Sequence, residues 1–186
     1  MRKVTFGVAN SLDNYIARTD HAVDWLLWGK EAAAFMTAYW KTIDAIVMGR
    51  KTYEVARRAG RKNPYPGMKC YVCSHTLRES PDENVQIVSE DVGAFVRALK
   101  KQPGKDICVM GGGELAKSLF EADVIDEVGL NIHPVLLGSG IPLYHRMSRQ
   151  TDLELTECRP FKNGCVLVMY RVKPKRARPR ASAKRR

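Results

Sequence analysis

Hydrophobic positions along the first two thirds of the chain alternate between two spacings. Apolar runs of strand length occupy residues 3–9, 43–48, 69–73, 85–88 and 107–110. Between the first two runs, the apolar side chains recur at the spacing of one helix face, at Ala32, Phe35, Met36, Tyr39 and Trp40. We interpret this aromatic and methionine face as core packing. Helices are also predicted over residues 50–58, over 92–99 and from the glycines at 111–113 to residue 120, and such alternation predicts an α/β fold around a largely parallel sheet.

The pattern changes near the C-terminus. Residues 126–132, 153–159 and 165–172 are strand-like, and no helical spacing separates the last two. The dipeptide Asn163-Gly164 between them suits a tight hairpin turn. The sheet is therefore expected to end in antiparallel strands.

Composition narrows the class of protein. A chain of 186 residues with 45% hydrophobic residues can build one substantial core. No apolar run approaches the roughly 18 residues that cross a bilayer, and the N-terminal apolar stretch is too short for a secretory signal, so we expect a cytoplasmic protein.

The five cysteines are odd in number and lie mostly in apolar runs, so no disulfides are expected. Cys70, Cys73 and His75 resemble half of a zinc site, but strand alternation separates the two thiols and no second pair follows, so no metal is expected.

The net charge of +11 is concentrated at one end. Residues 173–186 contain eight Lys or Arg and no acid, whereas residues 1–172 carry 23 basic and 20 acidic side chains. We expect one folded domain over 1–172 and a disordered basic tail over 173–186. Such a tail is usually only a solubilising segment, although it could bind polyanions weakly and without specificity.

Two glycine-bearing turns each follow a buried strand and begin a helix. They are Gly49-Arg50-Lys51-Thr52 and Gly111-Gly112-Gly113-Glu114. Strand ends of this kind present free N–H groups and the positive end of a helix, which together can hold a phosphate, and two such turns suit a diphosphate. Neither turn fits the G-x-G-x-x-G or P-loop pattern, so each taken alone is as readily a structural cap.

Four segments carry a resemblance to a known family. They are ANSLDNYIA at 9–17, VMGRKTYE at 47–54, VMGGGEL at 109–115 and PVLLGSGIPL at 134–143. Together they resemble the dihydrofolate-reductase-like superfamily, most closely its branch with the reductase domain of the riboflavin-biosynthesis deaminase-reductase. The resemblance covers residues 1–172 and implies a three-layer α/β fold with a mostly parallel central sheet and antiparallel C-terminal strands.

The same resemblance implies an enzyme that uses NADPH, and in this branch often a homodimer. The nicotinamide would lie beside the loop that begins at Ala9, and Ser74 would lie near the adenosine 2′-phosphate. The cofactor-binding residues that the resemblance implies are Ala9, Gly49, Arg50, Lys51, Thr52, Ser74, Gly111, Gly112, Gly113, Glu114 and Leu115.

The candidate acids differ from those of true dihydrofolate reductases. Their pterin-binding acid precedes the Met-Gly-Arg turn on a helix, where this chain has three alanines at 32–34, and Glu31 is the nearest carboxylate in sequence. Asp13 and Asp24 lie in the loop that would flank the nicotinamide. We take Asp13 and Glu31 as candidate catalytic residues, and Asp13, Asp24 and Trp25 as candidate substrate-binding residues. Asp13 is equally suited to an Asx-turn, and Asp24 to a helix cap or an exposed turn.

The leading hypothesis is therefore an NADPH-dependent reductase of a C=N or C=O bond in a small heterocycle. The substrate would be pteridine-like or a ribosylaminopyrimidine of the riboflavin-pathway type. Folate itself is not expected, because no placed acid recognises a pterin. The alternative is a nucleic-acid or polyanion-binding protein that acts through the basic tail.

Overall fold

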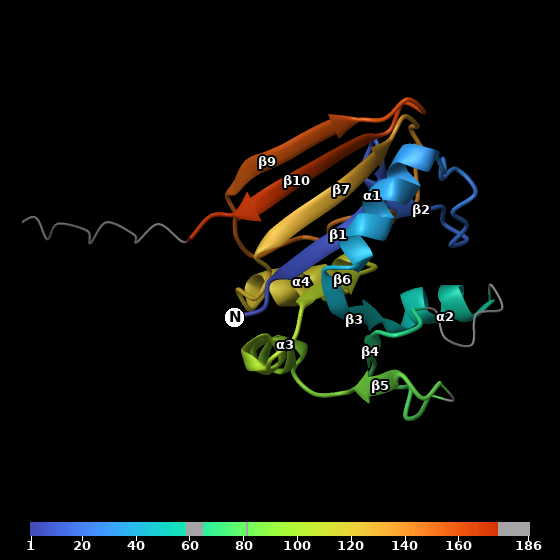
Figure 1. The fold of residues 1–186 in the computed structure, drawn as a ribbon. Helices are drawn as coiled ribbons and strands as arrows, with labels where there is room; N and C mark the ends of the chain where they lie inside the picture. Colours follow the sequence, from blue (N-terminus) through green and yellow to red (C-terminus); the bar gives the residue numbers. More distant parts are fainter. Residues whose placement is uncertain (59–64, 81, 175–186) are drawn as a thin grey trace, which may run out of the picture.

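The computed structural model describes residues 1–58, 65–80 and 82–174. An eight-stranded sheet forms its centre, and helices lie against both faces (Figure 1). In chain order the elements are β1 (Val4–Ser11), β2 (Tyr15–Ala17), α1 (Lys30–Trp40), β3 (Ile43–Gly49), α2 (Arg50–Arg58), β4 (Lys69–Cys73), β5 (Val85–Val88), α3 (Val92–Lys101), β6 (Asp106–Met110), α4 (Gly113–Glu121), β7 (Glu127–His133), β8 (Ile141–Pro142), β9 (Leu153–Pro160) and β10 (Val166–Val172).

The strands of the large sheet follow the order β5-β4-β3-β6-β1-β7-β10-β9. All neighbours from β5 to β7 are parallel, whereas β10 is antiparallel both to β7 and to β9. The β9–β10 hairpin turns at Asn163-Gly164, where Gly164 has a φ of +87° that glycine adopts without steric cost. The predicted fold class, a mostly parallel α/β sheet with antiparallel C-terminal strands, is confirmed.

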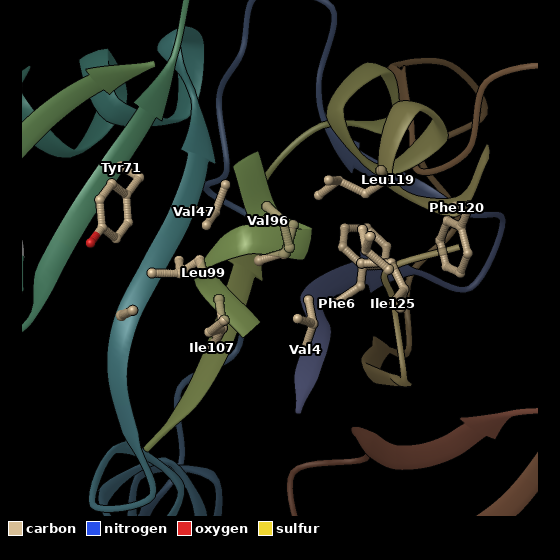
Figure 2. Packing of buried hydrophobic residues seen from close by; sticks show 14 of the residues in the cluster. Val4, Phe6, Val47, Tyr71, Val96, Leu99, Ile107, Leu119, Phe120 and Ile125 are labelled. Carbon is tan, nitrogen blue, oxygen red and sulfur yellow. The ribbon is translucent and has the colours of Figure 1, made fainter. Parts of the chain in front are cut away.

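Strand β1 shows how the two faces of the sheet differ. Val4 and Phe6 are at most 1% exposed and belong to the main core, which α3 and α4 complete (Figure 2). Burying a side chain such as Phe6 contributes roughly 1.5–3 kcal/mol, so this face provides much of the stability. Gly7 and Ala9 lie on the opposite face, towards α1, where they leave space beside the strand.

Most of the predicted elements are confirmed to within two residues. The sequence did not predict the small second sheet in which β2 pairs with β8. Strands of two and three residues carry no readable periodicity, and this pairing joins segments more than a hundred positions apart. The predicted basic tail lies outside the described residues from position 175 onward. All five cysteines are free thiols. No helix in the described part of the chain has both the length and the apolar character needed to cross a membrane.

Candidate functional site

Two glycine turns lie side by side at the carboxyl end of the sheet. β3 and β6 are parallel neighbours in which Met48 pairs with Met110, so Gly49 and Gly111 leave the sheet next to each other. Gly49 continues into α2, and Gly111 continues into α4. We call residues 49–52 and 111–113 the glycine ledge. It lies at the strand ends where open α/β sheets bind ligands.

The glycines of the ledge have different roles. Gly111 has a φ of +108°, and a Cβ there would overlap the Thr52 side chain, so glycine is required. Gly113 is also crowded, because a Cβ would lie 2.8 Å from a main-chain carbonyl oxygen. A Cβ at Gly49 would meet no atom within 4 Å, and one at Gly112 would meet only a side-chain carbon at 4.0 Å. The space beside Gly49 and Gly112 is therefore open to a ligand.

Cationic and N–H groups surround this open space. Arg50 and Lys51 begin α2, and the Arg50 guanidinium is 3.6 Å from the Glu54 carboxylate, with both side chains about 40% exposed. Gly112 is the N-cap of α4 and has no side-chain acceptor there, so the first N–H groups of α4 are free of a capping side chain. The ledge thus combines positive charge with free N–H donors, as anion binding requires.

The remaining predicted cofactor residues differ in their exposure and in their contacts. Ser74 follows β4 and is 9% exposed, and its hydroxyl oxygen accepts hydrogen bonds from the N–H groups of Leu77 (2.9 Å) and Thr76 (3.2 Å). Leu115 packs against the main core. The Glu114 side chain is 79% exposed, and its carboxylate is 3.3 Å from a ring nitrogen of His145, so it faces solvent.

Asp13 joins two loops. Its Oδ1 accepts hydrogen bonds from the Ser11 hydroxyl (2.6 Å) and the Leu137 N–H (3.1 Å), and its Oδ2 accepts one from the Gly138 N–H (2.8 Å). The hydrogen bond from Ser11, with those from Gly138 and Leu137, lowers the pKa of Asp13. We call this arrangement the Asp13 clamp. It matches the turn-holding alternative, and the geometry does not support a proton-donating role for Asp13.

The other candidate residues, Asp24, Glu31 and Trp25, each contact another part of the protein. Asp24 is 63% exposed and pairs with Arg18 at 2.7 Å, which lowers the pKa of Asp24. Glu31 accepts a hydrogen bond of 2.7 Å from the Lys162 N–H and so holds α1 to the β9–β10 hairpin. Trp25 is 8% exposed and packs edge-on against His133. Each of these three side chains therefore has a contact within the protein, and their catalytic and substrate-binding roles stay predictions.

A cavity of about 200 Å³ lies between α1 and the sheet. Its floor is formed by Gly7, Ala9 and Gly129, which contribute almost no side chain. Met110 lines it too, and because Gly111 follows directly, the cavity and the glycine ledge meet at the end of β6. The apolar side chains that line it are Leu26, Leu27, Trp28, Phe35, Met36, Tyr39, Trp40, Leu167 and Met169. The helical face that we interpreted as core packing does pack against the core clusters of the sheet, and its side chains also form one wall of this cavity.

The interior of the cavity carries no charge. None of its described lining residues is a carboxylate. Burial raises the pKa of the Cys108 thiol to about 12 and also raises the pKa of the Tyr39 hydroxyl, so both stay protonated near neutral pH. Planar, uncharged and largely apolar groups are the ligands that fit such a surface.

Polar side chains gather at the end of the cavity near Ala9. Asn131 pairs with Ala9 across β1 and β7, and His133 follows two residues later on the same face. His133 is 2% exposed, and burial lowers its pKa. Asn131 is not among the site residues predicted from the sequence. The only available signal was its period-two spacing with His133 on a predicted strand.

Comparisons with known proteins identify the family and agree with the fold. The family model described as "RibD C-terminal domain" matches residues 2–167. The uncharacterized protein YwjB of Bacillus subtilis strain 168 is 35% identical over 171 residues, which span 91% of this chain and 98% of YwjB. A crystal structure from Shewanella sp. PV-4, of a protein named for riboflavin biosynthesis, has a TM-score of 0.82 at 24% identity and covers 94% of this chain and 100% of its own. A pyrimidine reductase-like protein from Corynebacterium diphtheriae has a TM-score of 0.66 at 15% identity, over 94% of this chain and 93% of its own.

Proposed function

Because the chain belongs to the RibD C-terminal domain family, we propose that it is an NADPH-dependent reductase of a C=N or C=O bond in a small heterocycle. Pteridine-like compounds and ribosylaminopyrimidines of the riboflavin-pathway type are the proposed substrate classes. The family and the fold agree with the resemblance seen in the sequence. The cofactor, the reaction and the substrate class are the parts that we propose.

One observation carries the proposal: the apolar cavity meets the glycine ledge at the end of β6. A ledge alone would hold an anion, and a cavity alone would hold an apolar group. Placed together, they suit a cofactor whose diphosphate lies on the ledge while its ring reaches the cavity beside Ala9. Such a cofactor supplies a hydride to a ring bound in the cavity.

The residues present fit NADPH. Gly49 and Gly112 leave space for phosphate oxygens, and the first N–H groups of α4 can donate to them. Arg50 and Lys51 add positive charge, and the Ser74 hydroxyl, which lies 3.4 Å from the Thr76 hydroxyl, can turn its proton to a phosphate oxygen. We assign the 2′-phosphate of NADPH to the side where Arg50 and Ser74 lie, as the family resemblance implies.

The chain contributes positioning and water exclusion to the reaction. Hydride transfer needs the donor and acceptor carbons to be aligned in a dry site, which the wall of α1 and the open floor at Gly7 provide. Since no described lining residue is a carboxylate, we propose that any proton the product needs comes from water at the mouth of the cavity, outside its apolar interior. The absence of a carboxylate there also argues against folate as the substrate.

A homodimer is part of the same proposal. β9 is the last strand of the sheet, and Leu155 on it is 54% exposed. An open edge strand with exposed apolar side chains can pair with a second copy of the chain. Light scattering of the purified protein would give twice the mass of one chain.

Substitutions on the ledge test the cofactor site. Gly49→Val introduces methyl groups where the protein has no atoms, so we expect thermal stability to change little while NADPH affinity falls at least tenfold. Gly113→Ala should show the opposite pattern, a lowered melting temperature with residual affinity in the folded fraction. Equal NADPH binding by wild type and Gly49→Val, measured by nucleotide fluorescence, would refute the proposed site.

A truncation separates the proposal from its alternative. Deleting residues 173–186 should leave NADPH affinity and turnover unchanged, because the ledge and the cavity lie within residues 1–172. If the protein were a polyanion-binding protein, the truncation would abolish binding to heparin and NADPH would not bind to either form.

A further inference from the structure

Trp28 lies exposed at the mouth of the cavity. It is one of the lining residues, yet it is 82% exposed. Tryptophan side chains are largely buried on average, and Trp25, three residues earlier in the chain, is only 8% exposed. An indole at the entrance of a ligand site offers a large, rigid surface that a bound ring can cover. The exposure of Trp28 therefore points to a contact with a ligand.

The main chain holds Trp28 in place from both sides. The Leu27 N–H donates a hydrogen bond of 3.1 Å to Nδ1 of the buried His133. Gly29 is the N-cap of α1, and its carbonyl oxygen accepts a hydrogen bond of 2.9 Å from an N–H group of that helix. A Cβ at Gly29 would lie 3.2 Å from the side-chain nitrogen of Asn163, so this segment lies against the β9–β10 turn. Because the main chain is already ordered, a ligand that covers the indole has to order only the side chain.

The enclosed part of the cavity is small for the proposed reaction. Its volume of about 200 Å³ is below the roughly 300–1,000 Å³ of sites that enclose a drug-sized ligand. Hydride transfer brings the cofactor ring and the substrate ring together, so both rings must share this space. A substrate with two fused rings therefore extends beyond the enclosed part and into the mouth.

The glycine ledge and Trp28 lie on different sides of β1. The ledge adjoins the cavity at the end of β6, which is where the proposed cofactor enters. Leu27 is bonded to His133, the last residue of β7, so Trp28 lies on the β7 side. In the sheet, β1 separates β6 from β7. A substrate that extends away from the cofactor thus reaches Trp28.

We infer that the Trp28 indole stacks on the part of the substrate that extends from the cavity, and thereby selects planar fused rings over single rings. This inference rests on the proposed function and narrows its substrate classes to the pteridine-like one. Trp28 is thus a specificity-determining residue that takes no part in hydride or proton transfer. A single ring fits within the enclosed part and leaves the indole uncovered, so it binds without the contribution of stacking.

Two rings of different size test the contact. The full chain, saturated with NADP⁺, is titrated in a calorimeter with lumazine, which has two fused rings, and with uracil, which has one. We expect the wild type to bind lumazine more tightly than uracil. Trp28→Ala should weaken lumazine binding about ten- to hundredfold, whereas Trp28→Phe keeps an aromatic ring and should retain most of the affinity. Leu136→Ala is the matched control and should bind lumazine as the wild type does, because Leu136 is 69% exposed but is not among the described lining residues.

Two further measurements separate stacking from a role in folding or assembly. Since Trp28 is mostly exposed, Trp28→Ala should keep the melting temperature and the NADPH affinity of the wild type. A lower melting temperature would assign the indole to the fold, and a loss of NADPH affinity would assign it to the cofactor, and either result overturns the inference. Acrylamide should quench a fluorescence component of the ligand-free wild type that is absent from Trp28→Phe, equally at low and high protein concentration. Shielding of that component at high concentration would show that a second copy covers the indole, which also overturns the inference.

The remaining outcomes distinguish this inference from the proposed function. Equal lumazine affinity in wild type and Trp28→Ala overturns the inference, as does a wild type that binds no lumazine or prefers uracil. Failure of the wild type to bind NADPH counts instead against the proposed function. The lumazine titrations, repeated without nucleotide, then decide the role of Trp28 by the same criteria.

Discussion

Filling the cavity from its floor is the sharpest test of the substrate site. Gly7 lies in the interior of β1, and a Cβ there would meet only the Cys108 sulfur at 3.8 Å, an ordinary van der Waals contact. Gly7→Val therefore adds three carbons to space that is already present. Glycine in a strand interior costs roughly 0.5–1 kcal/mol relative to alanine, and each buried carbon contributes about 0.8 kcal/mol.

The sum of these contributions is an upper value, because part of the new side chain remains next to empty space. We therefore expect Gly7→Val to stabilise the fold by about 2 kcal/mol. For a chain of this size, each kcal/mol raises the melting temperature by roughly 2–4 °C, so we expect a rise of about 4–8 °C. The same carbons occupy the place of the substrate ring, so turnover should fall at least a hundredfold while NADPH affinity is retained. Calorimetry, nucleotide fluorescence and the rate of NADPH oxidation measure the three effects.

Gly7→Ala is the graded control, with about half the stabilisation and a smaller loss of turnover. A lower melting temperature for Gly7→Val would show that the space beneath α1 is not open. Unchanged turnover in a stabilised Gly7→Val would show that the substrate binds elsewhere.

Three further predictions concern single residues. Gly111→Ala combines a strained φ with overlap on the Thr52 side chain. It should destabilise the protein by about 1–2 kcal/mol in urea denaturation and weaken NADPH binding. An unchanged denaturation midpoint would contradict this. Asp13→Asn removes an acceptor from the Asp13 clamp. The pKa of Asp13 is lowered in the folded protein, so its contribution to the free energy of unfolding is complete above the ordinary pKa of about 4 and is lost as the pH falls through the folded value. Wild type and Asp13→Asn should therefore differ in melting temperature at pH 7 and converge in strong acid. The pKa of His133 is lowered in the folded protein, so the wild type should lose stability as the pH falls below about 6.5. The melting temperature of His133→Gln should depend less on pH between pH 7 and 5. Parallel pH dependence in the two proteins would refute the burial of a neutral ring.

The order and type of the main elements could be predicted because each has a local cause. The spacing from Ala32 to Trp40 identifies a helix, and Asn163-Gly164 identifies the hairpin that reverses the sheet. The glycine ledge was equally readable, since both turns follow buried strands. Asn14 takes a left-handed φ of +65° in the β1–β2 turn, a conformation that asparagine tolerates better than most residues.

The cavity and its polar end could not be predicted in the same way. They depend on which side chains meet across strands, as with Gly7 beside Gly129 and Ala9 beside Asn131. A glycine in a strand is an ordinary irregularity in sequence, and only the register shows that two of them form one floor. The candidate acids illustrate the converse, because Asp13 and Glu31 have suitable chemistry, but loop N–H groups bind both oxygens of Asp13 and Oε2 of Glu31, which no sequence pattern shows.

The Asp13 clamp has a consequence for how quickly ligands enter. It ties the β1–β2 turn to the segment at Leu137 and Gly138, so the rim that these two loops form, shortly after Ala9 in the chain, is ordered by hydrogen bonds of the protein itself. The entropy lost in ordering that rim is a cost of folding and does not weaken each encounter with a ligand. Association at this rim should therefore follow a single exponential that rises linearly with ligand concentration, without the plateau that a slow closing step would impose.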